Sequence, residues 1–320
     1  MTLQSISAEM VEQMGQNLQG NHDVLGPLPK AVKKRVCALK SLQLKTIDIE
    51  AKFYERVQAL EIEFEQLFKP LMEERRKIVT GEREPTDEEA SEKLLYEADD
   101  AEIEDLYKNS LPDTDKKGIP DFWLNALRSH DMISETIQEH DVPILSFLTD
   151  ITTTASLDPP SFTLEFHFAE NQFFSNKVIK KTYDLEIIPT NNEEKYRYEG
   201  PSVVRAYADK IDWLDGKDVT KKVVKKKQKK GAAAGKFLTK TIKADSFFNF
   251  FDPPTAPTDK NEDEELDEES LQSDYELGQT IRDSIIPRAV LFYTGELLTD
   301  EMFDYGEDDE EYSGDEDEDN

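Results

Sequence analysis

The feature that most constrains this chain is an apolar repeat that begins just after Pro29. Large apolar residues recur at steps of three, four or seven, Thr46 fills the one polar position, and no Gly or Pro interrupts before Pro70. The repeat comprises Val32, Val36, Leu39, Leu42, Ile49, Phe53, Val57, Leu60, Phe64 and Leu67. This spacing predicts one helix of about 39 residues, roughly 60 Å long at about 1.5 Å per residue.

Such a helix is longer than the domain that follows it. A compact domain of about 185 residues is only some 40 Å across, so a monomer would leave the apolar stripe in water. Burying ten large apolar side chains is worth on the order of 15 to 30 kcal/mol before any costs. Because a two-fold interface is self-complementary, we predict a homodimer. Its interface comprises Val36, Leu39, Leu42, Ile49, Phe53, Val57, Leu60, Phe64 and Leu67.

A second apolar line on the same helix is predicted to pack against the helix's own chain. It consists of Leu44, Ile47, Tyr54, Ile62, Phe68 and Met72. Pro70 lacks a backbone donor, so we expect it to bend the chain into a shorter second helix that ends near Gly81.

The net charge of −31 is concentrated in short windows. Residues 84–105, 259–276 and 304–320 together carry 30 of the 31 net negative charges, so the rest of the chain is nearly neutral. Like charges repel and bury little apolar area, which predicts that these windows are largely disordered or loosely held. A flexible polyanion neutralises Lys and Arg much as a phosphate backbone does, which indicates a binder of strongly basic proteins.

The rest of the chain predicts an α+β domain. After a disordered tail over 1–29, we expect the helical region 30–81, an acidic accessory segment 82–118, the folded domain 119–303 and an acidic disordered tail 304–320. Within the domain, "SFTLEFHF" alternates with period two, "NKVIKKTYDLEII" and "KIDWLD" continue as strands, and helices such as "GIPDFWLNAL" cover a mostly antiparallel sheet. A basic hairpin is expected at 217–243 and an acidic loop at 259–270.

Nothing in the sequence indicates catalysis. No His lies at metal-ligand spacing from another His or Cys, and no Walker loop, GxGxxG or GxSxG motif occurs. We therefore predict a protein that is not an enzyme and needs no cofactor. Cys37 is the only cysteine, which excludes an internal disulfide. The start of the chain resembles no signal peptide, and no apolar run approaches the roughly 18 to 20 residues that span a bilayer, so a soluble intracellular chain without membrane contact is expected.

Several long segments of the chain resemble the nucleosome assembly protein 1 family of histone chaperones. They are "LPKAVKKRVCALKSLQ", "FKPLMEERRKIVTG", "GIPDFWLNAL", "NQFFSNKVIKKTY", "SFFNFFDPP" and "IPRAVLFYTGE", and they occur in the family's order. The resemblance implies an antiparallel helix-mediated homodimer that binds core histones, both the 2A–2B dimer and the 3–4 tetramer. It also implies nucleosome assembly without ATP, histone import, and shuttling between nucleus and cytoplasm. The amino-terminal tail holds only Glu9, Glu12 and Asp23 as acids, and the sequence ends in "DEDEDN" rather than the prenylation box of some members, so we expect neither an amino-terminal histone contact nor a lipid anchor.

On this hypothesis the histone-binding carboxylates lie in the second and third acidic windows. They are Glu262, Asp263, Glu264, Glu265, Asp267, Glu268 and Glu269 beside the domain, and Glu307, Asp308, Asp309, Glu310, Glu311, Asp315, Glu316, Asp317, Glu318 and Asp319 in the tail. The alternative is an acidic scaffold that regulates an enzyme, as SET-type relatives do for a phosphatase, or a transport adaptor.

The lysine run "TKKVVKKKQKK" indicates an import signal read by an importin-type carrier. Its lysines are Lys221, Lys222, Lys225, Lys226, Lys227, Lys229 and Lys230. The alternatives are a solvated strand with no separate role or a contact with DNA, which the net charge of −31 opposes. We expect no sequence-specific nucleic-acid binding.

Three further features have competing interpretations. Val36, Leu39, Leu42 and Leu44 fit a leucine-rich export signal but share the dimer stripe. The phenylalanines Phe247, Phe248, Phe250 and Phe251 are expected in the core rather than stacked on bases. Thr86 and Ser313 have acids three residues on, the pattern of an acid-directed kinase site.

Overall fold

The computed structural model describes residues 25–112, 117–189, 195–227, 237–254 and 264–297. The chain divides into two compact units. The smaller comprises Met1–Arg56 and Ile187–Pro201, and the larger comprises Val57–Glu186 and Ser202–Asn320.

The long helix α2 runs without a break over Lys30–Val79, 50 residues, with Pro70 inside it. The expected second helix after Pro70 is therefore wrong, because the same helix continues to Val79. Two contacts hold the turn that follows the proline: Arg75 Nη1 donates to Ile286 O at 2.5 Å, and the Val79 side chain is buried in the core. These contacts offset the backbone hydrogen bond that the proline cannot make.

In the smaller unit, residues 195–201 pack on the first half of α2. Lys195 Nζ lies 2.6 Å from Asp48 Oδ1, and the Tyr198 hydroxyl donates to Ile187 O at 2.8 Å. Gly200 has φ +116, and a Cβ there would lie 3.3 Å from the Tyr54 ring, so the loop approaches the helix too closely for a larger residue to fit easily.

The larger unit is built on a four-stranded antiparallel sheet of order β1-β2-β3-β4. The strands are β1 Leu148–Leu157, β2 Pro160–Phe168, β3 Val178–Glu186 and β4 Ser202–Ala208. The predicted alternation in β2 is confirmed, since Phe162, Leu164, Phe166 and Phe168 are all buried. The segment "KIDWLD" is not a strand, because Trp213 makes only an isolated bridge to Phe174. The strand expected from that segment is instead supplied by β4, which pairs with β3 at the edge of the sheet.

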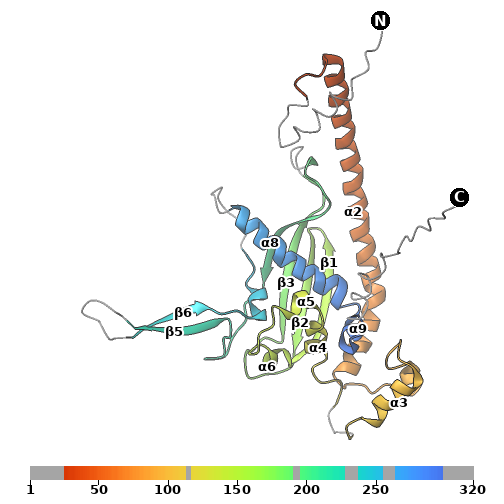
Figure 1. The fold of residues 1–320 in the computed structure, drawn as a ribbon, viewed down its shortest axis with the longest axis vertical. Coiled ribbons are helices and arrows are strands. Elements are labelled where there is room, and N and C mark those ends of the chain that lie inside the picture. The colour runs from red at the N-terminus through yellow and green to blue at the C-terminus, as the bar shows by residue number, and fades with distance from the viewer. Residues whose placement is uncertain (1–24, 113–116, 190–194, 228–236, 255–263, 298–320) are drawn as a thin grey trace, which may run out of the picture. The chain divides into compact units, whose positions relative to one another are not determined.

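The outer edge of β1 is covered by the second half of α2 (Figure 1). Gln58 Nε2 donates to Ser156 O at 2.8 Å, and Ala155 N donates to Glu65 Oε2 at 3.0 Å. Polar helix side chains thus occupy backbone groups that would otherwise offer an open edge for pairing.

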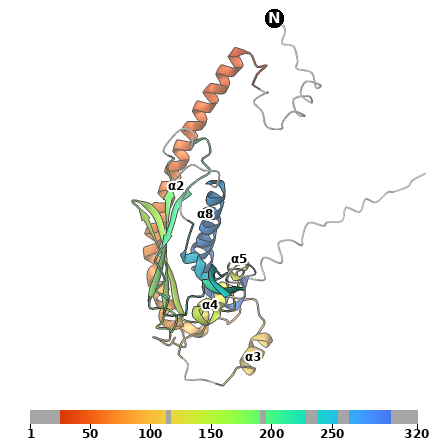
Figure 2. The same ribbon diagram turned by 90° about the vertical axis from the view of Figure 1, so that its left-hand side faces the viewer.

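Short helices and α8 cover the face of the sheet that carries the β2 aromatics (Figure 2). They are α4 Phe122–Arg128, α5 Asp131–Ser134, α6 Val142–Leu145, the 3-10 helix η3 Phe247–Phe251, α8 Glu264–Gln279, the π-helix η4 Thr280–Ile285 and α9 Ala289–Thr294. All four phenylalanines of η3 are buried, which confirms the core interpretation and leaves no ring free to stack on a base. The predicted α+β class, a helix-covered antiparallel sheet, is confirmed.

The predicted basic hairpin is also confirmed. Strands β5 Lys221–Lys227 and β6 Phe237–Lys243 pair antiparallel, in register from Lys221 with Lys243 to Lys227 with Phe237. Residues 228–236 between them, with Lys229 and Lys230, lie outside the described residues.

The first acidic window contains more structure than its charge suggested. It holds the 3-10 turn η2 Glu89–Ser91 and the helix α3 Asp100–Lys108. The acidic accessory segment 82–118, called the acidic excursion below, leaves the domain and returns to it at nearly the same place. There Ile119 N donates to Val79 O at 2.9 Å, and a Cβ on Gly81 would lie 2.4 Å from Gly118 N. Only glycines allow this approach.

The second acidic window is partly helical, which corrects the expected loop. Helix α8 begins at Glu264, so Glu264, Glu265, Asp267, Glu268 and Glu269 form its first turns. Carboxylates are favourable there because the helix N-terminus carries partial positive charge. Residues 259–263 and the tail 304–320 lie outside the described residues. Within the described part of the chain, no helix is long and apolar enough to cross a membrane.

Candidate functional site

The predicted dimer stripe on α2 is exposed. Seven large apolar side chains keep 46–70% of their surface in solvent: Leu39, Leu42, Ile49, Phe53, Leu60, Phe64 and Leu67. Val36 and Val57 are half-buried. On the opposite line Ile47 is buried and Leu44, Tyr54, Ile62 and Met72 are half-buried, but Phe68 is 53% exposed and does not pack as expected. Each half of α2 therefore presents exposed large apolar side chains to solvent.

The acidic start of α8 is mounted on the sheet by a buried ion pair. Lys181 on β3 has no exposed surface, and its Nζ lies 2.6 Å from Asp274 Oδ1, 2.5 Å from Phe250 O and 3.5 Å from the centre of the Phe250 ring. Burial lowers the pKa of Lys181 to about 8, and Asp274 opposes that shift. The Tyr183 hydroxyl donates to Asp274 O at 2.8 Å.

A glycine lets α8 lie flat against the same strand. A Cβ on Gly278 would be 2.5 Å from the Tyr183 ring. Further up this helix, the carboxylates Glu268 and Glu269 are exposed. The core contacts hold the helix, and Glu268 and Glu269 near its start face solvent, whereas the side chains of Glu264, Glu265 and Asp267 are not described. Of the predicted histone-binding carboxylates, Glu262, Asp263 and the ten in the tail lie outside the described residues.

A second buried charge pair ties α2 to β1 and to the end of η4. Arg75 Nη2 lies 4.0 Å from Asp150 Oδ1, and the Arg75 guanidinium sits 4.8 Å from the Trp123 ring centre. Burial raises the pKa of Asp150 to about 6, although Arg75 opposes the shift. Among the described residues, no group of three or more His, Cys, Asp or Glu side chains is arranged to hold a metal ion.

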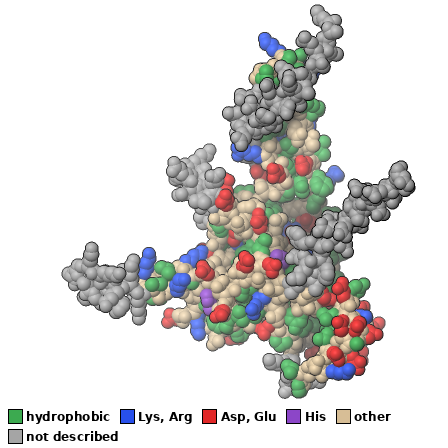
Figure 3. Space-filling view, viewed as in Figure 1, with side chains coloured by type: hydrophobic (Ala, Val, Ile, Leu, Met, Phe, Trp, Pro, Cys, Tyr) green, Lys and Arg blue, Asp and Glu red, His purple; other side chains and the backbone are tan. Residues whose placement is uncertain are grey.

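Helix α3 carries a compact group of carboxylates (Figure 3). Its first turn is closed by a capping box: Asp99 Oδ1 accepts from Glu102 N at 2.9 Å, and Glu102 Oε2 accepts from Asp99 N at 3.0 Å. Both groups favour the helix and stay in solvent. Exposed apolar side chains flank them, among them Tyr96, Tyr107 and Leu111.

The lysine hairpin is anchored at its base, and the described side chains at the start of β5 are exposed. Lys221 and Lys222 are exposed, and Lys221 Nζ lies 2.7 Å from Asp218 Oδ2, which raises the pKa of that lysine. Lys225, Lys226 and Lys227 belong to β5, but their side chains are not described.

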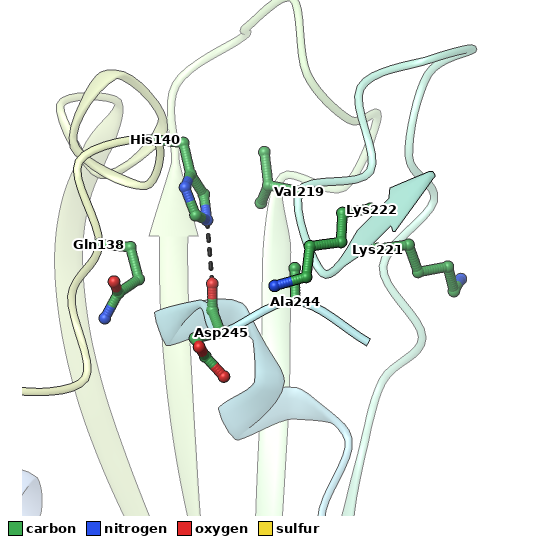
Figure 4. Close-up of a pocket in the computed structure, with 7 residues that line it drawn as sticks. All are labelled: Gln138, His140, Val219, Lys221, Lys222, Ala244 and Asp245. Atoms are coloured by element: carbon green, nitrogen blue, oxygen red, sulfur yellow. Dashed lines mark hydrogen bonds between the residues drawn. The ribbon is translucent and has the colours of Figure 1, made fainter. Parts of the chain in front are cut away.

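A shallow pocket of about 460 Å³ lies where the hairpin meets the domain (Figure 4). Beside it, His140 Nε2 contacts Asp245 O at 3.0 Å, and the buried Asp141 accepts from Ser246 Oγ at 2.6 Å and from Phe247 N at 2.7 Å. These bonds fix the end of β6 to the core, so the hairpin has a rigid base.

Comparison with known proteins agrees with this architecture. Residues 34–296 match the family model described as nucleosome assembly protein (NAP). The chain is 44% identical to nucleosome assembly protein 1-like 1 of Xenopus tropicalis over 88% of this chain and 73% of that protein. It is 43% identical to nucleosome assembly protein 1-like 4 of Homo sapiens over 88% and 78%. The crystal structure of nucleosome assembly protein 1 from Plasmodium knowlesi is similar, with 28% identity, a TM-score of 0.50, and coverage of 84% of this chain and 98% of that one.

Proposed function

Because this chain belongs to the nucleosome assembly protein family, we propose that it is a histone chaperone. It binds core histones, both the 2A–2B dimer and the 3–4 tetramer, and promotes nucleosome assembly without ATP. As a chaperone it acts by binding and release rather than by catalysis.

The observation that carries this proposal is that the net negative charge lies in three short segments, whereas the rest of the chain is nearly neutral. Three windows hold 30 of the 31 net negative charges, and the folded body that bears them is close to neutral. In the described part, Glu268 and Glu269 on α8 and the carboxylates of α3 are exposed. A histone can therefore be neutralised by segments at the surface while the body supplies shape.

The exposed stripe of α2 supports a homodimer. Leu39, Leu42, Ile49, Phe53, Leu60, Phe64 and Leu67 form a surface too apolar to remain in water. A second copy of the same helix is complementary to it. Each dimer then presents two sets of acidic segments to the histones.

We also propose that the protein moves between nucleus and cytoplasm. The exposed lysines of the β5–β6 hairpin, held on a rigid base, suit recognition by an importin-type carrier. Val36, Leu39, Leu42 and Leu44 serve as the export signal when the dimer surface opens locally.

Histone binding is tested by titrating the full-length protein with purified 2A–2B dimer over a salt series, with naked DNA as competitor. A chaperone binds 2A–2B tightly at physiological salt and outcompetes non-specific DNA. A variant with Glu264, Glu265, Glu268 and Glu269 changed to Gln binds more weakly and shows a smaller salt dependence, because fewer counterions are exchanged. A second variant, with four acids of α3 (Asp100, Glu102, Glu104 and Asp105) changed to the corresponding amides, removes the same charge from the other exposed acidic helix and should also weaken binding. Equal affinity for 2A–2B and for lysozyme, another basic protein, contradicts the proposal.

A further inference from the structure

Thr86 lies in an exposed turn at the start of the acidic excursion, and its hydroxyl is already engaged. Glu89 Oε2 accepts from Thr86 N at 2.8 Å and from Thr86 Oγ1 at 3.2 Å, while Glu89 N donates back to Thr86 Oγ1 at 3.3 Å. These reciprocal bonds close the turn from Thr86 to Glu89 that leads into η2. The next three residues are all acidic: Asp87, Glu88 and Glu89.

A guanidinium lies beside this hydroxyl. Arg83 Nη1 is 2.8 Å from Glu89 Oε2, the same oxygen that accepts from Thr86, and Arg83 Nη2 is 3.1 Å from Glu89 Oε1. Arg83 Nε also lies 3.0 Å from Glu74 Oε2 near the end of α2. Thr86 Oγ1 and the Arg83 fork thus share one carboxylate oxygen between them.

We propose that Thr86 is a phosphorylation site and that its phosphate takes Arg83 from Glu89. An acid-directed serine/threonine kinase transfers the γ-phosphoryl group of ATP to Thr86 Oγ1. The Oγ1–H bond is replaced by an Oγ1–P bond, ADP leaves, and one proton is released.

The geometry gives the phosphate an immediate partner. A phosphothreonine carries about −1.5 to −2 charges near neutral pH and three acceptor oxygens, against one charge and two oxygens for Glu89. Arginine pairs with phosphate in a bidentate fashion. Because Glu89 Oε2 lies 3.2 Å from Thr86 Oγ1, the carboxylate and the phosphate cannot share that position. The stronger anion therefore keeps Arg83, and Glu89 turns to solvent.

The modification then has two local consequences. Arg83 keeps its ion pair with Glu74 on α2, so the phosphate, by binding Arg83, connects the start of the acidic excursion to α2. Glu89 loses the partner that lowers its pKa to about 2, and an additional unpaired carboxylate joins the exposed acids of this segment.

The test uses the full-length protein with Ser313→Ala, treated with ATP and a recombinant acid-directed kinase. Mass spectrometry should find phosphate on Thr86, absent from a Thr86→Ala sample. The pKa of the phosphate is then followed by phosphorus NMR. Pairing with Arg83 should place it lower than in an Arg83→Gln protein by about 0.5 to 1, a modest effect because the site is exposed.

Arg76→Gln is the matched control. Arg76 belongs to the same surface and pairs with Glu73 and Glu82 rather than with Glu89, so its loss changes the net charge equally. The neighbouring carboxylates Glu84, Asp87 and Glu88 are the same in all samples. A phosphate pKa that is equal in wild-type, Arg83→Gln and Arg76→Gln proteins overturns the capture by Arg83, and failure of the kinase to modify Thr86 overturns the site.

Discussion

The proposed homodimer makes a quantitative prediction for Leu60→Ala. Leu60 is 53% exposed in one chain, so about half of its side chain remains to be buried by a partner. Full burial of such a side chain is worth about 1.5–3 kcal/mol, and truncation also leaves a cavity. We expect about 1–1.5 kcal/mol per chain and, because the two-fold axis counts each change twice, about 2–3 kcal/mol per dimer. The dimer dissociation constant then rises roughly 30- to 150-fold.

Sedimentation equilibrium over a concentration series measures this constant directly. Leu111→Ala is the control, because Leu111 is 87% exposed but lies in the acidic excursion rather than on the stripe. Circular dichroism of each variant checks that α2 remains helical. A wild-type protein that is monomeric throughout the series, or a Leu60→Ala protein whose constant matches the Leu111→Ala control, refutes the reasoning.

Three predictions concern the contacts that hold the domain together. The pKa of Asp150 is raised to about 6 in the folded protein, so between about pH 4 and 6 the folded state binds the proton more tightly than the unfolded state does. Urea unfolding at each pH should show the wild type losing about 2 to 2.5 kcal/mol relative to Asp150→Asn as the pH rises from 4 to 7. Asp274→Ala leaves the Lys181 ammonium buried without its carboxylate and should lower the unfolding free energy by about 3 kcal/mol. The double change of Lys181→Met with Asp274→Leu should lower it by less. Equal losses of unfolding free energy for the single and double variants in urea titrations argue against an uncompensated buried charge. Gly278→Ala introduces a Cβ 2.5 Å from the Tyr183 ring and should destabilise the protein by about 1–3 kcal/mol despite the helix propensity of Ala, while Ser273→Ala, on the exposed face of α8, leaves the urea midpoint unchanged.

Much of the fold follows from periodicity alone. The step of two in "SFTLEFHF" placed four apolar residues on one face of β2, and the steps of three and four placed the exposed stripe on α2. These patterns are predictive because they reflect which side of an element is buried. Strand β4 carries a weaker pattern, since Val204 and Tyr207 are both exposed and only Ala206 is buried, so it was not recognised.

The missed features depend on contacts between distant residues. Alternation with Ile179 and Tyr183 puts Lys181 on the core face of β3, but no local pattern says that its partner is Asp274, 93 residues away. The sequence underestimates the length of α2 because a proline ends a helix only where no tertiary contact stabilises the residues that follow. Here the hydrogen bond from Arg75 to the Ile286 carbonyl provides such a contact. The order in the first acidic window had a local signal that the charge obscured: Asp99 and Glu102 stand at capping-box spacing.

The concentration of acid in segments also explains how a chain of net charge −31 keeps a stable body. Self-repulsion destabilises a compact state when like charges are forced together within it. On the described sheet, the carboxylates are instead matched with bases: Glu165 with Lys180 at 2.6 Å and Asp184 with Arg205 at 2.5 Å. The surplus lies in the three acidic windows. On the proposed function, changing the exposed Glu268 and Glu269 to Gln should therefore weaken histone binding without removing the Lys181–Asp274 contact that holds α8 to the sheet.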